Sequence, residues 1–134
     1  MPREITAIVT SDLDPDRPPR VERLDPATLR SDRPIYRPLV DALTRGDRPE
    51  ERLIVASDLR IAPKFRGREE DIEAGVRHLD TLRLLRQEFL SRVLVMERRD
   101  GSLWIYDDCA YVAAVQRQSP DTVLPCAVFR DPTR

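Results

Sequence analysis

The stretch LWIYDDCAYVAAVQRQSPDTVLPCAVF, residues 103–129, decides most of the expected fold. Apolar runs of strand length over 103–106 and 122–129 enclose an acidic turn and an alanine-rich segment over 108–118. This order predicts a strand, a turn, a helix and a closing strand, because the apolar spacing changes from strand-like to helix-like and back. Junctions of this kind bind anions in many folds, since the first backbone N–H groups of a helix have no acceptor within the helix.

The turn and the helix carry further local signals. We expect Asp107 or Asp108 to cap the helix, because a carboxylate there can accept a hydrogen bond from its free N–H groups. Pro125 indicates that the closing strand lies at an edge of the sheet or contains a bulge, since proline cannot donate to a neighbouring strand. The helix carries small side chains that permit close packing on a sheet, at Ala110, Ala113 and Ala114.

Further elements are predicted upstream of this stretch. Leu53–Ala56 is short and apolar, which indicates a buried strand, whereas Leu59–Gly67 is expected to be a loop because Pro63 disfavours a helix. Val93–Glu97 is expected to form a hairpin with 103–106, since Asp-Gly lies between them. One amphipathic helix is predicted from near Glu69, with apolar residues at steps of three and four: Ile72, Val76, Leu79, Leu82, Leu85 and Phe89.

The first 49 residues differ in composition from the rest. Eight of the twelve prolines fall at or before Pro49, and such a segment cannot hold long regular elements. We therefore expect residues 1–49 to form a proline-rich arm that packs on the body, with an edge strand at Ile5–Val9 and a short helix from Leu39 to Thr44 that ends at Gly46. Residues 50–134 are expected to form one α+β domain with a small mixed sheet and two main helices.

Composition limits the classes of function. The chain has 134 residues and a formal net charge of −1, so no overall field attracts nucleic acid. Its two cysteines, Cys109 and Cys126, are too far apart for a CxxC pair and too few for a disulfide scaffold, which favours free thiols in a reducing compartment. Neither a signal peptide nor a membrane-spanning stretch is recognisable, so the expected location is the cytoplasm.

From Leu53 to Phe129 the chain resembles the ParB/sulfiredoxin superfamily. The resemblance rests on the order of elements, the basic loop APKFRGR over 62–68, the hairpin, and the strand–turn–helix–strand that ends in TVLPCAVF. It covers about residues 53–130 and leaves the arm unmatched. The resemblance implies a bacterial or phage protein with a ParB/sulfiredoxin-like fold.

The turn departs from the pattern of this superfamily. ParB-like members have Asp-Gly followed by a helix with an arginine, and sulfiredoxins have Phe-Gly-Gly-Cys-His-Arg. Cys109 falls on the position of the sulfiredoxin cysteine, but Asp107 and Asp108 replace the glycines, and Ala110 and Tyr111 replace the histidine and the arginine. Two carboxylates repel a phosphate, so the sequence predicts a degenerate nucleotide-binding turn.

Three residues of the turn are the catalytic candidates if the site is active: Asp107, Asp108 and Cys109. Helix capping is the interpretation we favour for the aspartates, and a small buried role for Cys109, because its carboxylate neighbours oppose a thiolate. On this interpretation the chain has no catalytic residue. No metal site is predicted either, since a single Asp-Asp pair is insufficient and His78 is the one histidine.

The loop before the long helix holds the candidate anion-binding cluster of Lys64, Arg66 and Arg68. The favoured interpretation is a solvated loop, because three acidic residues follow directly and can neutralise it. Trp104 is expected to fill the core rather than to anchor an interface, and Cys126 is expected to be core.

The sequence therefore favours a non-catalytic binding module that acts through a protein partner or a larger assembly. We expect it to need no cofactor, to make no direct contact with DNA and to have no membrane partner. The alternative, implied by the resemblance, is a nucleotide-dependent enzyme or a CTP- or ATP-binding switch, such as a ParB-like nuclease or phosphotransferase, that uses ATP or CTP with Mg²⁺. Sulfiredoxin-like thiol chemistry at Cys109 is a third hypothesis, and it requires a phosphate site that the sequence does not supply.

Overall fold

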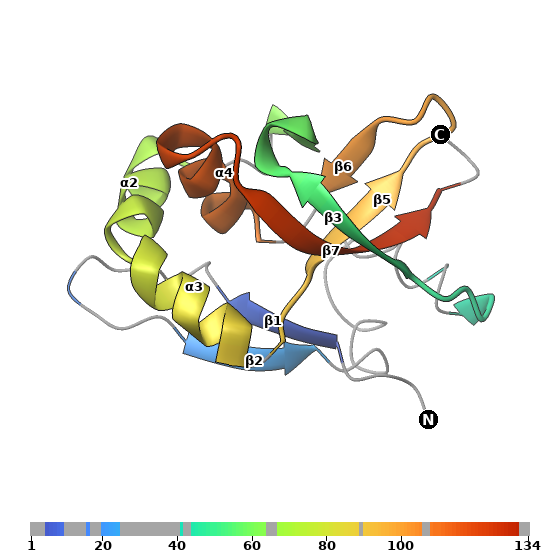
Figure 1. Ribbon diagram of the computed structural model, residues 1–134, viewed down its shortest axis with the longest axis horizontal. Helices are drawn as coiled ribbons and strands as arrows, with labels where there is room; N and C mark the ends of the chain where they lie inside the picture. Colours follow the sequence, from blue (N-terminus) through green and yellow to red (C-terminus); the bar gives the residue numbers. More distant parts are fainter. Residues whose placement is uncertain are drawn as a thin grey trace.

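A computed structural model describes residues 5–9, 16, 20–24, 41, 44–63, 67–88, 90–105 and 108–131. Its centre is a mixed five-stranded sheet in the order β3-β7-β5-β6-β4, which packs on three helices (Figure 1). The α+β class is therefore confirmed. The elements are β3 (Glu50–Val55), a 3₁₀ turn η3 (Ala56–Asp58), β4 (Leu59–Ile61), α2 (Glu69–Arg77), α3 (Leu79–Glu88), β5 (Val93–Glu97), β6 (Leu103–Ile105), α4 (Cys109–Gln118) and β7 (Val123–Arg130).

The hairpin, the last helix and the closing strand form as predicted. β5 and β6 pair antiparallel across a turn in which Gly101 takes a φ of 83°, a conformation that favours glycine. The expected loop over 59–67 is wrong for its first three residues, which form β4 and pair in parallel with β6. Leu59 and Ile61 lie opposite Leu103 and Ile105, so pairing adds apolar side chains to the core face of the sheet.

β7 lies between β3 and β5, so the expectation that Pro125 marks an edge or a bulge is wrong. The Ala56 N–H donates to the Thr122 carbonyl at 2.8 Å, which makes Ala56 and Thr122 a hydrogen-bonded pair of the antiparallel ladder. Hydrogen-bonded and non-hydrogen-bonded pairs alternate along such a ladder, so Pro125 and Leu53 form a non-hydrogen-bonded pair, in which the Pro125 nitrogen donates nothing to β3. On the other side, pairing with β5 begins at Cys126, one residue later. Proline is tolerated in this central strand because neither ladder requires its missing N–H.

The predicted long helix is two helices. It begins at Glu69 as expected, but it breaks at His78, whose backbone has φ −96° and ψ 10°. The His78 N–H still donates to the Ala74 carbonyl at 3.1 Å, and the His78 carbonyl accepts from Leu82 at 2.8 Å. The expected two main helices are therefore three, because α2 and α3 turn relative to each other at this residue (Figure 1).

The small side chains of α4 meet a helix as well as the sheet. A Cβ at Gly75 of α2 would lie 3.1 Å from the Ala110 carbonyl oxygen and 3.2 Å from the Ala114 Cβ. Glycine and alanine thus let the backbones of α2 and α4 approach closely. The sequence correctly predicted close packing at these alanines, but it assigned the partner to the sheet alone.

The two faces of the sheet have different environments. The face toward the helices is the main core, with side chains such as Ile54, Val93, Val95 and Ile105 nearly or fully buried. On the opposite face, the central strands carry buried apolar side chains, whereas β3 and the start of β7 expose Leu53 and Val123 at 75% and 50%. The buried residues of this opposite face are Leu94, Met96, Ala127 and Phe129.

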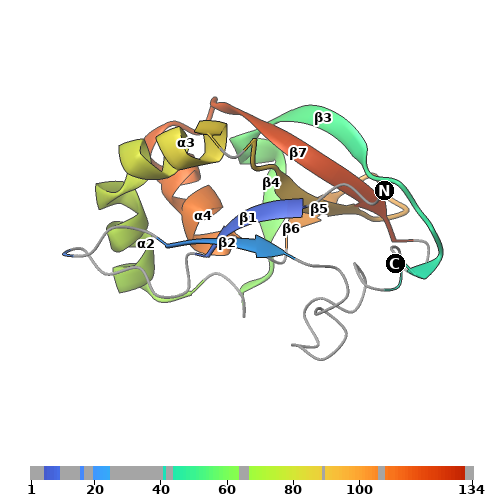
Figure 2. The ribbon, with the colours of Figure 1, turned by 90° about the horizontal axis from the view of Figure 1, so that it is seen from below.

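Residues 5–24 contribute a second, two-stranded sheet. The expected strand at Ile5–Val9 forms as β1 and pairs antiparallel with β2 (Arg20–Leu24), a strand that the sequence did not predict. Figure 2 shows this ribbon beside the helices and the larger sheet.

Part of the predicted short helix near residue 44 is also described. Asp41 and Thr44 are helical, the Arg45 N–H donates to the Asp41 carbonyl at 3.0 Å, and Gly46 takes a φ of 78° at its end. Leu39, where this helix was expected to begin, lies outside the described residues. None of the helices in the described part of the chain is long and apolar enough to cross a bilayer.

Candidate functional site

Asp108 occupies the turn between β6 and α4, directly before the first residue of the helix. Its backbone is left-handed, with φ 58° and ψ 23°, and its side chain is fully buried. Aspartate adopts this conformation more readily than most residues other than glycine. The left-handed backbone of this turn therefore accommodates a carboxylate directly before the first residue of α4.

The carboxylate of Asp108 does not cap α4, so the capping prediction is wrong for this residue. It accepts a hydrogen bond from Arg86 instead, with 3.1 Å between Nη2 and Oδ2. Asp107, the other predicted cap and catalytic candidate, lies outside the described residues.

Arg86 belongs to the last turn of α3 and is the partner that the sequence did not predict. Its side chain is 7% exposed, and its guanidinium carbon lies 4.4 Å from the centre of the Tyr111 ring. The Arg86 carbonyl accepts from the Ser91 N–H at 2.8 Å, which closes the end of α3. One signal was available: Arg86 continues the buried Leu79 and Leu82 stripe at a step of four, and a charge on such a stripe requires a buried partner.

The pair between α3 and α4 is not fully satisfied. Arg86 Nη1 and Asp108 Oδ1 are both buried, and neither has a hydrogen-bond partner among the described residues. A buried ion pair contributes little net stability because both charges lose their hydration, but the loss of one partner leaves an uncompensated charge. Removing either Arg86 or Asp108 alone should therefore destabilise the fold strongly, even if the pair contributes little net free energy of unfolding.

The two thiols lie close to this corner and are buried. Burial raises the pKa of Cys126 to about 12, although the positive charge of Arg86 opposes the shift. Burial also raises the pKa of Tyr111, with Arg86 again opposing. Cys126 is core, as predicted, and Cys109 is 9% exposed at the start of α4. Cys126 is a protonated thiol at neutral pH, and a protonated thiol is a poor nucleophile.

Arg68 is the one member of the predicted anion-binding cluster that lies within the described residues; Lys64 and Arg66 do not. Its side chain is 78% exposed, and its guanidinium lies 3.7 Å from both Glu70 and Asp71. Its backbone N–H donates to the Asp71 carboxylate at 3.0 Å, which caps α2. The positive charge of Arg68 is thus offset by the acidic first turn.

Gln116 of α4 has a role that the sequence did not indicate. Its Nε2 donates to the carbonyl oxygens of Ala56 and Leu59, at 2.8 Å each. These bonds join α4 to the turn between β3 and β4, about sixty residues away in the chain. Nothing local predicts such a contact.

Trp104 is only partly buried, so the prediction that it fills the core is wrong. Its ring lies under two guanidinium groups, with 3.9 Å to Arg98 and 5.8 Å to Arg60, and its indole N–H donates to the Ser102 hydroxyl at 2.8 Å. The pKa of Asp100 is lowered, first by its hydrogen bonds with Ser102 and then by the two arginines. These contacts give Trp104 a structural role in the hairpin of β5 and β6.

Among the residues that the structure describes, no group of three histidine, cysteine or acidic side chains is arranged to hold a metal ion. Comparison with protein-family models, curated proteins and solved structures finds no match to this chain. The features of the described residues that bear on function are therefore the corner of Asp108 and the exposed surface.

Proposed function

We propose that the chain is a non-catalytic ParB/sulfiredoxin-like binding module that acts through a protein partner or a larger assembly. The observation that carries this proposal is the Asp108 carboxylate, which is fully buried at the start of α4 and held by Arg86. A phosphate approaching this helix terminus would meet a negative charge, and the nearest buried cation already has an anionic partner. The order of strands and helices from β3 to β7 supports the proposed scaffold.

The exposed surface provides positions at which a protein partner can be tested. Two large apolar side chains, Leu84 within α3 and Leu90 after its end, are 67% and 76% exposed. Isolated exposed apolar residues are common on protein surfaces and do not by themselves identify an interface. They are suitable positions for substitutions that test one. Lysine at either position changes the surface and leaves the core untouched.

Calorimetry with ATP and with CTP, each with Mg²⁺, tests the absence of nucleotide binding. We expect no measurable heat for the wild-type chain. Micromolar binding that Arg66→Ala weakens would establish the nucleotide-dependent enzyme or switch instead. Asp108→Gly, which restores the residue type of the superfamily pattern, shows whether Asp108 is the block: nucleotide binding by this folded variant would localise the exclusion to its carboxylate.

The partner is tested by affinity capture from the native host, followed by direct binding of the purified candidate. The double variant Leu84→Lys, Leu90→Lys should weaken the binding of a partner that contacts α3 and the residue after its end. Arg68→Ala, a substitution at an exposed side chain before α2, should leave that binding unchanged. A chain that binds no protein directly, in a preparation shown to be folded, would contradict the proposal.

A further inference from the structure

Two arginine side chains lie against Trp104 in the hairpin of β5 and β6. Arg98 directly follows β5, and Arg60 of β4 is level with Trp104 in the parallel pairing with β6. Their guanidinium carbons lie 3.9 Å and 5.8 Å from the centre of the Trp104 ring. Ile105, the next residue of β6, is fully buried on the face toward the helices, so Trp104 and Arg60 lie on the opposite face. We refer to Arg60, Arg98 and Trp104 as the hairpin patch.

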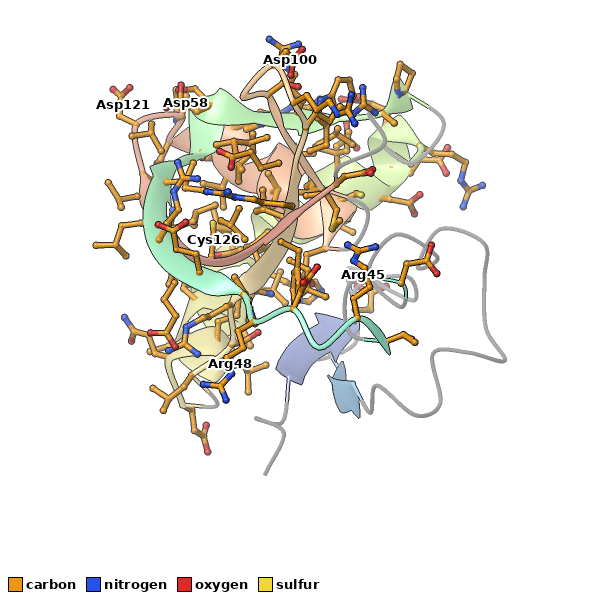
Figure 3. All side chains as sticks on the ribbon, turned by 90° about the vertical axis from the view of Figure 1, so that its right-hand side faces the viewer. Arg45, Arg48, Asp58, Asp100, Asp121 and Cys126 are labelled. Carbon is orange, nitrogen blue, oxygen red and sulfur yellow. The ribbon has the colours of Figure 1, made fainter. Side chains whose placement is uncertain are left out.

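The Trp104 ring is itself fixed by hydrogen bonds in the turn of the hairpin. The indole N–H donates to the Ser102 hydroxyl at 2.8 Å, and the hydroxyl and the N–H of Ser102 both donate to Asp100 Oδ1. Figure 3 shows Asp100 at the outer end of this hairpin. The two arginines therefore contact a ring of defined position, which restricts their rotamers before any ligand binds and lowers the entropy cost of binding.

The charges of the two arginines are not paired within the described part of the chain. Neither Arg60 nor Arg98 has a carboxylate at ion-pair distance among the described residues, whereas arginines such as Arg52 and Arg92 do. Arg98 Nε is buried and has no hydrogen-bond partner among these residues. The hairpin patch thus presents two ordered guanidinium groups, whose forked donors suit a carboxylate or a phosphate.

The surroundings of the hairpin patch favour the carboxylates of a peptide over the phosphates of a nucleic acid. A nucleic acid carries a continuous row of phosphates, and proteins bind it through many cations spread along that row. Exposed carboxylates flank this patch instead, with Asp58 two residues before Arg60 and Asp100 in the turn. They would repel the neighbouring phosphates of a nucleic acid, whereas a short acidic segment can place its few carboxylates at the two arginines alone.

We propose that the hairpin patch binds an acidic segment of the partner protein, with carboxylates at the guanidinium groups of Arg60 and Arg98. Trp104 acts as a positioning residue that holds both arginines for this contact. Arginine and tryptophan are also the residue types enriched where truncation costs most binding energy in protein interfaces. This inference rests on the proposed function, because it names the chemistry of the partner that the binding module recognises.

Fluorescence anisotropy tests the site with a labelled peptide in which aspartate alternates with glycine. We expect saturable binding to the wild-type chain that weakens as the salt concentration rises. The same peptide with asparagine in place of aspartate should not bind, and a single-stranded oligonucleotide of equal charge should bind more weakly than the acidic peptide. Absence of binding by the acidic peptide, or tighter binding by the oligonucleotide, would overturn the proposal.

Charge reversal locates the binding site on the molecule. Arg60→Glu and Arg98→Glu should each weaken peptide binding about tenfold or more, because each removes an attraction and adds a repulsion. Arg48→Glu is the matched control, since Arg48 is exposed and lies at the opposite end of the molecule from Asp100 (Figure 3). It makes the same change in net charge and should alter the dissociation constant by less than about twofold. An equal loss in all three variants would indicate general attraction of charge and refute the site.

Two substitutions at Trp104 test its positioning role. Trp104→Leu keeps both positive charges but removes the ring, so we expect peptide binding to weaken about threefold or more. Trp104→Phe keeps an aromatic face and should retain most of the affinity. Circular dichroism on each variant checks that the fold is retained. A folded Trp104→Leu variant that binds the peptide as tightly as the wild-type chain would refute the positioning role.

The double variant Arg60→Glu, Arg98→Glu separates this proposal from the proposed function. A directly binding partner from the native host should lose most of its affinity for the double variant. A partner that binds the double variant and the wild-type chain equally would contradict the role of the hairpin patch and leave the proposed function intact. Failure to bind any protein would contradict the proposed function, whereas the peptide measurement tests the patch by itself.

Discussion

The aspartates at the N-termini of α2 and α4 have different roles. Asp71, in the first turn of α2, accepts the Arg68 N–H at 3.0 Å and remains partly exposed. Asp108, before α4, is fully buried, caps nothing and pairs with Arg86. The difference teaches that burial, and not the residue type at a helix end, decides whether a carboxylate acts as a cap or as one half of an ion pair.

Replacing aspartate by asparagine at both helix ends tests this difference, and we expect the larger loss of stability at the buried Asp108. Asp108→Asn keeps a residue that tolerates the left-handed backbone but leaves the Arg86 charge without a counter-ion, so we expect a loss of about 3 kcal/mol in the free energy of unfolding. Urea denaturation measures it. Adding Arg86→Met should recover much of the loss, and a double variant no more stable than the single one would show that charge is not the cause.

Asp71→Asn is the matched change at the exposed end. The amide oxygen can still accept a hydrogen bond from the Arg68 N–H, and only the negative charge at the helix terminus is lost. We therefore expect the free energy of unfolding to fall by about 0.5–1 kcal/mol. The same denaturation experiment applies. If Asp71→Asn cost as much as Asp108→Asn, the contrast between the two helix ends would be broken.

Leu90 allows a second comparison, because it and Asp108 are the two described residues other than glycine with a positive φ. Leu90 takes φ 51° at the end of α3 and is 76% exposed. Leu90→Gly removes the steric cost of this conformation, and we expect a gain of about 0.5 kcal/mol after the entropy of glycine in the unfolded chain is subtracted. A loss of stability would mean that the Leu90 side chain makes contacts that outweigh its strain.

The smallest effect is expected at Arg68. Its guanidinium is 78% exposed, and its ion pairs with Glu70 and Asp71 are solvated, so Arg68→Ala should change the free energy of unfolding by less than about 0.5 kcal/mol. The change should diminish further in high salt. A larger loss would assign the side chain a structural role that its exposure does not indicate.

Much of the fold was predictable from local patterns. The hairpin around Gly101, the start of α2 at Glu69, the extent of α4 and the closing strand all follow from apolar spacing and turn residues. The break at His78 was not predictable, because the apolar pattern runs through it without interruption. Strand β4 was missed since three residues give too short a pattern, and pairing with β6 determines its conformation.

The candidate site was predictable in position but not in its contacts. The sequence predicted an acidic turn between the strand and the helix at Asp108, yet it assigned the Asp108 carboxylate to the wrong partner. Arg86 lies 22 residues away, on a different helix, and the alternative of a cap is locally equivalent. The contacts of Gln116 were missed for the same reason.

By itself the sequence determined most of the strands and helices of the larger sheet and its helical layer, where most of them begin, and that the corner before α4 carries negative charge. The tertiary structure decided that Asp108 faces Arg86, that Pro125 is tolerated in a central strand and that β3 is an edge. The physical reason is the distance along the chain over which the interactions act. Local conformation depends on spacing within a few residues, whereas burial and strand order depend on which distant segments meet.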